Sequence, residues 1–202
     1  MKKLLLFITL MMVSALVLNA QLEAGKVLIG TSTTLSGSSL LADCPNTAGF
    51  SVISSKYKTD EYESDASQIT TFNLTPRVGF LVTDAVLAGA QVNIESYKEE
   101  DSDAVTTFSF GPFARYYFDL SNFKPFVQAG MNIGQVNYGD GYKMNLFNYG
   151  GGIGGAFFFS DHVSFDLLLN YTHAYMKDKD SSDNARDLMD TFGFGFGLSI
   201  FL

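Results

Sequence analysis

Residues 192–202 read Phe-Gly-Phe-Gly-Phe-Gly-Leu-Ser-Ile-Phe-Leu in a chain of 202 residues. Large apolar residues alternate with small ones, and successive side chains of a β-strand point to opposite faces of a sheet. The stretch therefore predicts a strand with one apolar face. That face consists of Phe192, Phe194, Phe196, Leu198, Ile200 and Leu202. Phe201 is the exception, because it falls on the face of the glycines.

The same alternation recurs upstream and predicts six further strands. They lie at residues 72–80, 86–95, 108–118, 127–134, 147–157 and 163–172. Phe113 and Leu168 break the alternation in their segments. Beyond the N-terminal segment, no stretch offers the roughly 18 consecutive apolar residues of a membrane helix, and none keeps a helical period. The chain is predicted to be all-β.

The first strand is harder to place. Residues 26–35 and 49–57 both have the composition of a strand, and small and polar residues separate them. The strand at 72–80 must descend to a short turn, so a single ascending strand has to precede it. We therefore predict one interrupted first strand, followed by an outward loop at 56–66. This gives eight strands, an even number.

The connections between the predicted strands alternate in length. The short ones are residues 83–85, 120–123 and 160–162. The longer, charged ones are residues 98–103, 139–143 and 177–187. Short turns at one end and long loops at the other are typical of outer-membrane barrels. We therefore expect an eight-stranded antiparallel up-and-down transmembrane β-barrel.

Composition narrows the class of protein. The chain is 47% hydrophobic and 17% charged, which argues against intrinsic disorder. Its formal net charge of −8 and scattered basic residues argue against nucleic-acid binding, which needs a clustered basic surface. The single cysteine, Cys44, excludes a disulfide framework and a cysteine-based metal cluster, and it is interpreted as a lone thiol.

The N-terminal segment has the composition of a secretory signal peptide. Lys2 and Lys3 precede an apolar run that ends in Leu18-Asn19-Ala20. A positive start, a short apolar core and a small residue at the cut are the parts of such a signal. The apolar run is shorter than the roughly 20 residues of a spanning helix. We predict a signal peptide at 1–20 and a barrel domain at 21–202, exported to the outer membrane.

Alternation alone does not say which face is inside, and a soluble lipocalin-like carrier is the competing architecture. A solvated surface usually carries about 25–35% charged residues. The polar faces here instead carry Gly, Ser, Asn, Thr and Gln with isolated charges, which suits the crowded lumen of an eight-stranded barrel. The apolar faces, nearly free of charge, suit lipid. We therefore expect the phenylalanines and leucines to face acyl chains.

Four charged residues fall on the polar faces of their strands: Arg77, Glu95, Arg115 and Asp166. Unpaired charges in a lumen would be costly, so we expect the four to form a buried network. One interpretation is a structural plug of salt bridges and hydrogen bonds. The other is a narrow or gated pathway for small solutes or ions, in which these groups exchange partners.

Four motifs stand out along the chain: the signal ending before Gln21, the Thr-Thr-Phe-x-x-x-Pro strand starts at 70–76 and 106–112, the segment 111–118 and the alternating last strand. In these motifs the chain resembles the eight-stranded outer-membrane barrel family that includes OmpX-like and OmpA-like barrels, in particular its Bacteroidetes-type members. The resemblance covers nearly the whole mature chain. It implies an integral outer-membrane protein whose last strand is read by the barrel assembly machinery, although Phe201 here is penultimate rather than terminal.

Candidate chemistry is sparse. Residues 150–155 formally contain Gly-x-Gly-x-x-Gly, but that motif binds phosphate at a helix N-terminus, and a strand is predicted to follow here. His162 and His173 lie near opposite ends of one predicted strand and cannot share a metal. His173 shares the lipid-facing side with Tyr171 and Tyr175, which favours an interfacial belt. We therefore predict no enzymatic activity, no cofactor and no metal.

The expected partners are those of a surface barrel: outer-membrane lipid, lipopolysaccharide and the assembly machinery, with the barrel itself monomeric. Acidic loop residues are usually solvated tips. Those at 60–65 and at Glu99-Glu100-Asp101 are candidates for bridging lipopolysaccharide phosphates through divalent cations, or for contacting an unidentified surface partner. The predicted role is structural or interactive, with a narrow pore and a soluble carrier as alternatives.

Overall fold

The structure is a computed structural model that describes residues 22–35, 50–55, 67–99, 103–120, 123–139, 142–178 and 187–202. The predicted signal peptide at 1–20, Cys44, the loop at 56–66, and Glu100 and Asp101 lie outside these residues. Within the described part of the chain, no helix has the length and hydrophobicity needed to span a membrane.

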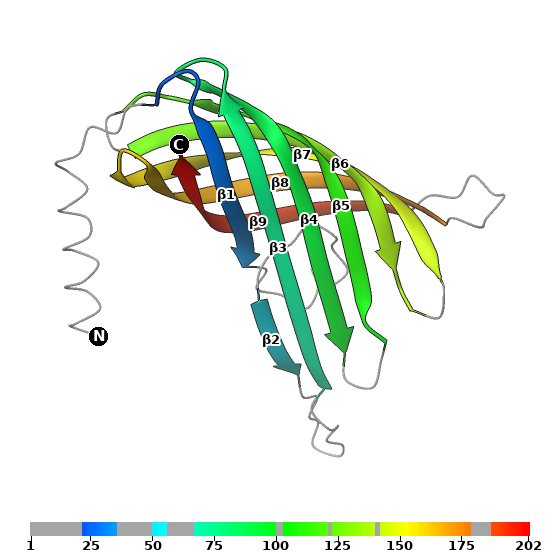
Figure 1. The fold of residues 1–202 in the computed structure, drawn as a ribbon. Helices are drawn as coiled ribbons and strands as arrows, with labels where there is room; N and C mark the ends of the chain where they lie inside the picture. The colour runs from blue at the N-terminus through cyan, green and yellow to red at the C-terminus, as the bar shows by residue number, and fades with distance from the viewer. Residues whose placement is uncertain are drawn as a thin grey trace, which may run out of the picture.

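The described strands form one antiparallel sheet. They are β1 (Val27–Leu35), β2 (Phe50–Ser55), β3 (Ser67–Leu81), β4 (Val86–Glu99), β5 (Val105–Tyr117), β6 (Phe123–Asn137), β7 (Lys143–Ser160), β8 (Val163–Asp178) and β9 (Asp187–Phe201). The strand order is β1-β9-β8-β7-β6-β5-β4-β3-β2, and a further pairing of β1 with β3 closes the sheet. The predicted eight-stranded antiparallel barrel is confirmed (Figure 1).

β1 and β2 together make the interrupted first strand that the sequence predicts. β1 pairs with β3 from Val27↔Phe80 to Ser32↔Thr75, and β2 continues along the same partner from Phe50↔Phe72. The last residues of β1, up to Leu35, pair only with β9. β2 therefore takes the place beside β3 that β1 leaves, which is why nine segments build an eight-stranded barrel.

The short connections all lie at one end of the barrel, which we call the turn end; the opposite end is the loop end (Figure 1). The C-terminus lies at the turn end, where Val27 and Leu202 exchange both backbone hydrogen bonds. Thr83 accepts hydrogen bonds from two backbone amides of its turn through its hydroxyl. At the loop end, Gly139 occupies a left-handed turn conformation with φ +89°.

The strands are longer than the sequence pattern predicts. β3 to β9 have 13 to 18 residues, whereas about 9–11 suffice to cross the hydrocarbon layer. The predicted loops at 98–103, 139–143 and 177–187 each lose residues to the neighbouring strands, and Phe123 and Ser160 belong to strands rather than turns. Backbone pairing continues past the apolar band, because ladder hydrogen bonds do not require apolar side chains. The strands are therefore longer than the crossing of a hydrocarbon layer requires.

The predicted orientation of the two faces is confirmed. Large apolar side chains on the outward face are exposed, including those of Val78, Phe108, Ile133, Ile153 and Leu198. The polar face points inward. Its buried members include Asn73, Arg77, Asn93, Glu95, Ser109, Arg115, Asn132, Asn148, Asp166 and Ser199. An exterior of this kind suits acyl chains rather than water, and it is the reverse of what a soluble lipocalin-like carrier needs.

Candidate functional site: the lumen

The inside of the turn end is filled by an apolar cluster, which we call the turn plug. It consists of Leu22, Leu28, Leu81, Leu87, Phe113, Tyr117, Phe126, Ala156, Phe158 and Phe201, with Leu168 packed against it. The three residues that break the sequence alternation, Phe113, Leu168 and Phe201, all belong to this group. These three large apolar residues fall on the polar face of their strands because that face points into the lumen, and there they close the turn end.

Inward-facing glycines make room for the rings of the turn plug. A Cβ atom on Gly89 would lie 2.8 Å from Cε1 of Phe113, and one on Gly154 would lie 2.5 Å from Cζ of Phe126. Real Cβ atoms do not approach other heavy atoms so closely. The Gly-x-Gly-x-x-Gly match at 150–155 lies within β7, so these glycines serve strand packing inside a barrel.

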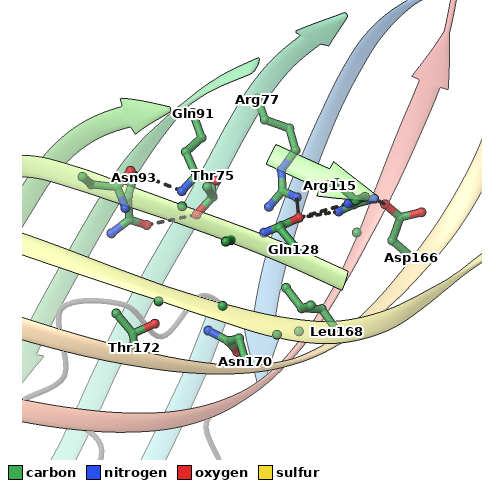
Figure 2. Close-up of a pocket in the computed structure, with 18 of the residues that line it drawn as sticks. Thr75, Arg77, Gln91, Asn93, Arg115, Gln128, Asp166, Leu168, Asn170 and Thr172 are labelled. Carbon is green, nitrogen blue, oxygen red and sulfur yellow. Dashed lines mark hydrogen bonds and ion pairs between the residues drawn. The ribbon is translucent and has the colours of Figure 1, made fainter. Parts of the chain in front are cut away.

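A charged layer borders the turn plug, because the guanidiniums of Arg77 and Arg115 lie over the rings of Phe113 and Phe126. Figure 2 shows Arg77, Arg115 and Asp166 of this layer. Nη1 of Arg115 lies 2.6 Å from Oδ2 of Asp166, and both side chains are almost fully buried. Ser164 and Ser199 donate hydrogen bonds to the same carboxylate, at 2.8 and 2.9 Å. Cζ of Arg115 lies 3.8 Å from the ring centroid of Phe126, so the plug also supplies a cation–π contact. A buried ion pair offsets the cost of its desolvation only when further hydrogen-bond partners satisfy its remaining polar atoms, and these contacts supply such partners.

Arg77 joins the layer through a shared amide. Its Nη1 donates to Oε1 of Gln128 at 3.2 Å, and the same oxygen accepts from Nε and Nη2 of Arg115 at 3.1 and 2.8 Å. Two guanidinium groups thus converge on one neutral oxygen. The sequence alone does not single out Gln128 as a member of this layer. The alternating pattern of residues 127–134 does place it on the polar face of β6, which points inward.

Glu95, the fourth predicted member, does not join the layer. It lies opposite Asn73 on β3 and Thr107 on β5, four residues along β4 from Gln91, which pairs with Arg77. At about 3.3 Å per residue this separation is ~13 Å. Its Oε2 atom is buried and has no hydrogen-bond partner among the described residues. The structure thus groups Arg77, Arg115 and Asp166 and sets Glu95 apart.

The loop half of the lumen has a different lining. Val136, Met144, Leu146, Ala174 and Met176 form a second buried apolar cluster on β6, β7 and β8. The inward faces of β3 to β5 in the same half carry polar atoms without hydrogen-bond partners among the described residues. These are both amide atoms of Asn73, Oε2 of Glu95 and Oγ of Ser109. Hydrogen bonding of buried polar atoms is therefore less complete in this half of the lumen, towards the loop end, than in the turn half, which holds the turn plug and the charged layer.

A polar cluster lies on the described part of the outer wall, near the loop end. Asp190 accepts a hydrogen bond from the hydroxyl of Tyr171, and it pairs with Nδ1 of His173. The His173 ring contacts those of Tyr149 and Tyr175, with centroids 5.6 and 4.7 Å away. This arrangement fits the interfacial belt predicted for His173. Within the described part of the chain, no three potential metal ligands gather.

The predicted C-terminal assembly strand is β9. Its outward face presents Phe192, Phe194, Leu198 and Ile200, all exposed, with Phe196 half-buried. Exposed Leu202 follows the last residue of the strand. Phe201 points inward and is fully buried, and its ring packs on Phe158 with centroids 5.4 Å apart. The penultimate aromatic residue therefore belongs to the turn plug rather than to the lipid-facing surface.

Comparison with known proteins supplies the family. Structural similarity extends over most of the chain to OprG of Pseudomonas aeruginosa (15% identity, 92% of this chain and 99% of that one, TM-score 0.47) and to outer membrane protein W of E. coli (17%, 89% and 99%, TM-score 0.46). TM-scores below 0.5 carry no argument about function. No curated protein sequence matches. Residues 5–200 match the outer membrane protein beta-barrel domain, so the chain belongs to that family.

Proposed function

We propose that this protein is an integral outer-membrane barrel, exported by its N-terminal signal peptide, whose role is structural or interactive at the cell surface and whose lumen does not conduct. The observation that carries the proposal is the pairing of an apolar exterior with an interior closed at the turn end. Phe126, Phe158 and Phe201 are each no more than 1% exposed inside the barrel. A continuous water path through this layer would have to displace close-packed rings.

The exterior supports stable residence in lipid. A closed barrel satisfies its backbone hydrogen bonds internally, which the hydrocarbon core demands. Outward aromatic side chains occur towards both ends of the wall. Tyr116, Phe118 and Phe123 lie near the turns, whereas Tyr149 and Tyr171 lie nearer the loops. Aromatic girdles at both interfaces are typical of such barrels.

Heat-modifiable gel migration tests the barrel. Mature protein refolded in detergent should migrate differently in SDS before and after boiling, because a closed barrel resists SDS until heated. Membrane fractions should retain it after a high-salt wash. Identical migration, or recovery as a water-soluble monomer, would overturn the assignment.

A narrow pore is the second candidate function, favoured by the polar middle of the lumen, where Asn93, Asn132 and Asn148 are buried. Planar bilayer recording separates the two functions. The closed barrel should give no current steps, whereas a Phe126→Ala/Phe158→Ala variant, which thins the turn plug, should give small ones. Steps of the same size in both proteins would favour the pore.

A surface role in the outer membrane implies contact with lipopolysaccharide. We propose that lipopolysaccharide contacts the aromatic wall near the loop end, and that the acidic residues Glu99, Glu100 and Asp101, which start at the last residue of β4, bridge its phosphates through divalent cations. Neutralising these three residues should weaken lipopolysaccharide retention and make it insensitive to a chelator. Retention that is unchanged and still sensitive to a chelator would show that these three residues do not bind lipopolysaccharide.

The last strand is proposed as the segment that the assembly machinery reads. Replacing outward Phe194 by Ser should slow membrane insertion in cells, while the same change at exposed Val78 on β3 serves as the matched control. Equal insertion of both variants would contradict a special role for the last strand.

A further inference from the structure

Two neighbouring polar layers of the lumen wall on β3 and β4 differ in their hydrogen bonding. In the layer nearer the turns, Thr75 donates a hydrogen bond to Oδ1 of Asn93 at 3.0 Å. Two residues further along both strands, Asn73 lies directly opposite Glu95. Both amide atoms of Asn73 and Oε2 of Glu95 are buried without a hydrogen-bond partner among the described residues. Side-chain hydrogen bonding between these strands therefore stops one layer before Glu95.

The neighbouring strand β5 adds a further oxygen to this layer. Register places Glu95 opposite Thr107, and Ser109, two residues along on the same inward face, lies diagonally across from Glu95. Such diagonal neighbours are about 7–8 Å apart, within reach of a glutamate side chain. Oγ of Ser109 is also buried and has no partner in the described part of the chain. We call Asn73, Glu95 and Ser109 the oxygen cluster.

The burial of the oxygen cluster makes its unpaired atoms costly. The side chains of Asn73, Glu95 and Ser109 are 2%, 5% and 0% exposed. A buried polar atom without a partner loses its hydration and gains nothing in return, and the loss is larger for a charged group. Buried polar groups that lack a protein partner are commonly satisfied by a bound water molecule or ion. The oxygen cluster therefore has the properties of a site that a ligand completes.

The charge of the Glu95 carboxylate indicates the sign of that ligand. Besides Glu95, the buried charged side chains of the described lumen are those of Arg77, Arg115, Lys124 and Asp166. The three cations among them lie towards the turn end. Arg77 pairs with Gln91, which lies four residues and ~13 Å along β4 from Glu95. A positively charged ligand at the oxygen cluster would therefore supply a counter-charge that the described side chains do not supply at contact distance.

A cavity beside the oxygen cluster provides room for water. It has a volume of about 100 Å³, and Thr75 and Asn93 are part of its wall (Figure 2). These two residues lie on the same strand faces as Asn73 and Glu95, at a distance of two residues or ~7 Å. One water molecule needs only ~10–15 Å³. A cation at the oxygen cluster can therefore keep part of its hydration shell on the side of the cavity.

We propose that the oxygen cluster binds a monovalent cation of the alkali class, held by the carboxylate of Glu95, Oδ1 of Asn73 and Oγ of Ser109. Carboxylate, carbonyl and hydroxyl oxygens are the ligands that hard cations prefer. One carboxylate balances one positive charge, whereas a divalent ion would leave an excess charge buried. A proton on Glu95 can be donated to only one of the other two oxygens, whereas a cation contacts all three. The site goes beyond the proposed surface role and requires only a closed barrel.

Rubidium serves as the crystallographic probe, because it scatters anomalously. Crystals of detergent-purified protein grown in rubidium chloride should show an anomalous peak in contact with the Glu95 carboxylate. Crystals grown in strontium chloride should show no peak at this position. Absence of the rubidium peak would overturn the proposal, because a proton or a water molecule would then satisfy the cluster. A strontium peak at the same position would overturn the assignment to a monovalent ion.

Urea unfolding in micelles tests the same site in solution. In a buffer whose other cations are tetramethylammonium ions, added rubidium chloride should raise the urea midpoint of the wild-type protein more than added tetramethylammonium chloride does, because a ligand of the folded state stabilises that state. Glu95→Gln should lose this gain. Asp161→Asn removes one negative charge from the exposed turn between β7 and β8 and should keep it. Equal gains in the two variants would mean that rubidium acts as a general salt and not at a site.

A second variant removes a ligand without changing the charge. Ser109→Ala deletes one oxygen of the cluster and should weaken rubidium binding severalfold, measured as the rubidium concentration that gives half of the midpoint gain. An unchanged concentration would contradict a site built from three protein oxygens.

Heat-modifiable migration of each protein distinguishes failure of this site from failure of the proposed function. Wild-type protein that migrates as a closed barrel but binds no rubidium overturns the cation site alone. Wild-type protein that never migrates as a closed barrel overturns the proposed membrane function itself.

Discussion

The turn half and the loop half of the lumen each bury a carboxylate, and their surroundings differ. Asp166 in the turn half accepts hydrogen bonds from Arg115, Ser164 and Ser199. Glu95 in the loop half is equally buried, but its Oε2 has no hydrogen-bond partner among the described residues. The contrast teaches that position along the barrel axis, and not only inward parity, decides what a lumen charge does.

The largest expected loss in the free energy of unfolding comes from removing the Arg115–Asp166 ion pair of the turn half. Asp166→Ala leaves Arg115 buried without its carboxylate, and breaking one side of a buried pair costs about 3–5 kcal/mol. Urea unfolding of the protein in micelles should show this loss in the free energy of unfolding. Asp161→Ala, at the exposed turn between β7 and β8, is the control and should show no comparable loss. Equal losses would mean that the ion pair contributes nothing special.

A smaller effect is expected from overfilling the turn plug. The Cβ of a valine at Gly154 would lie 2.5 Å from the Phe126 ring and 2.2 Å from the carbonyl oxygen of Leu167. Overpacking of this kind costs about 1–3 kcal/mol. Gly130→Ala, where the nearest atom is 3.1 Å away, should cost less in the same urea experiment. The reverse order would show that the plug tolerates added volume.

The loop half should respond with the opposite sign. Glu95→Gln keeps the shape of the side chain but removes a buried carboxyl group. At neutral pH in a buffer without alkali cations, that group must either stay charged without a counter-ion at contact distance within the described lumen or take up a proton. We expect the free energy of unfolding to rise by about 1 kcal/mol, since either state of the buried carboxyl group costs free energy that a glutamine amide does not. A loss approaching that of Asp166→Ala would instead show that Glu95 has a charged partner, and the two halves would then be alike.

The sequence predicts the barrel well because the signal is local. Alternation within one strand determines which face is inward, so Phe113, Leu168 and Phe201 are recognisable as exceptions from the order of residues alone. The partner of a lumen charge is not a local property. Arg115 on β5 meets Asp166 on β8, and their common level depends on register and strand stagger. Neither is encoded in the parity of a single strand.

Because a single strand does not encode its pairing with distant segments, the sequence also leaves open the level of Glu95 in the lumen and the pairing of the first strand. Glu95 shares inward parity with the three charges of the turn half, yet register sets it near the loop end. The sequence likewise predicts two pieces of one strand at 26–35 and 49–57. It does not show that β2 replaces β1 beside β3 while β1 continues along β9. Pairings between distant segments are needed to see this.

The smallest expected effect lies on the outer wall. Asp190 pairs with His173 and Tyr171, but its side chain is 61% exposed, and exposed ion pairs contribute little to stability. Asp190→Asn should leave the urea midpoint in micelles within experimental error, and Tyr171→Phe should do the same. A loss as large as that of Gly154→Val would show that Asp190 is buried against another molecule. The wall near the loop end would then be a protein or lipid interface that shields this ion pair from water.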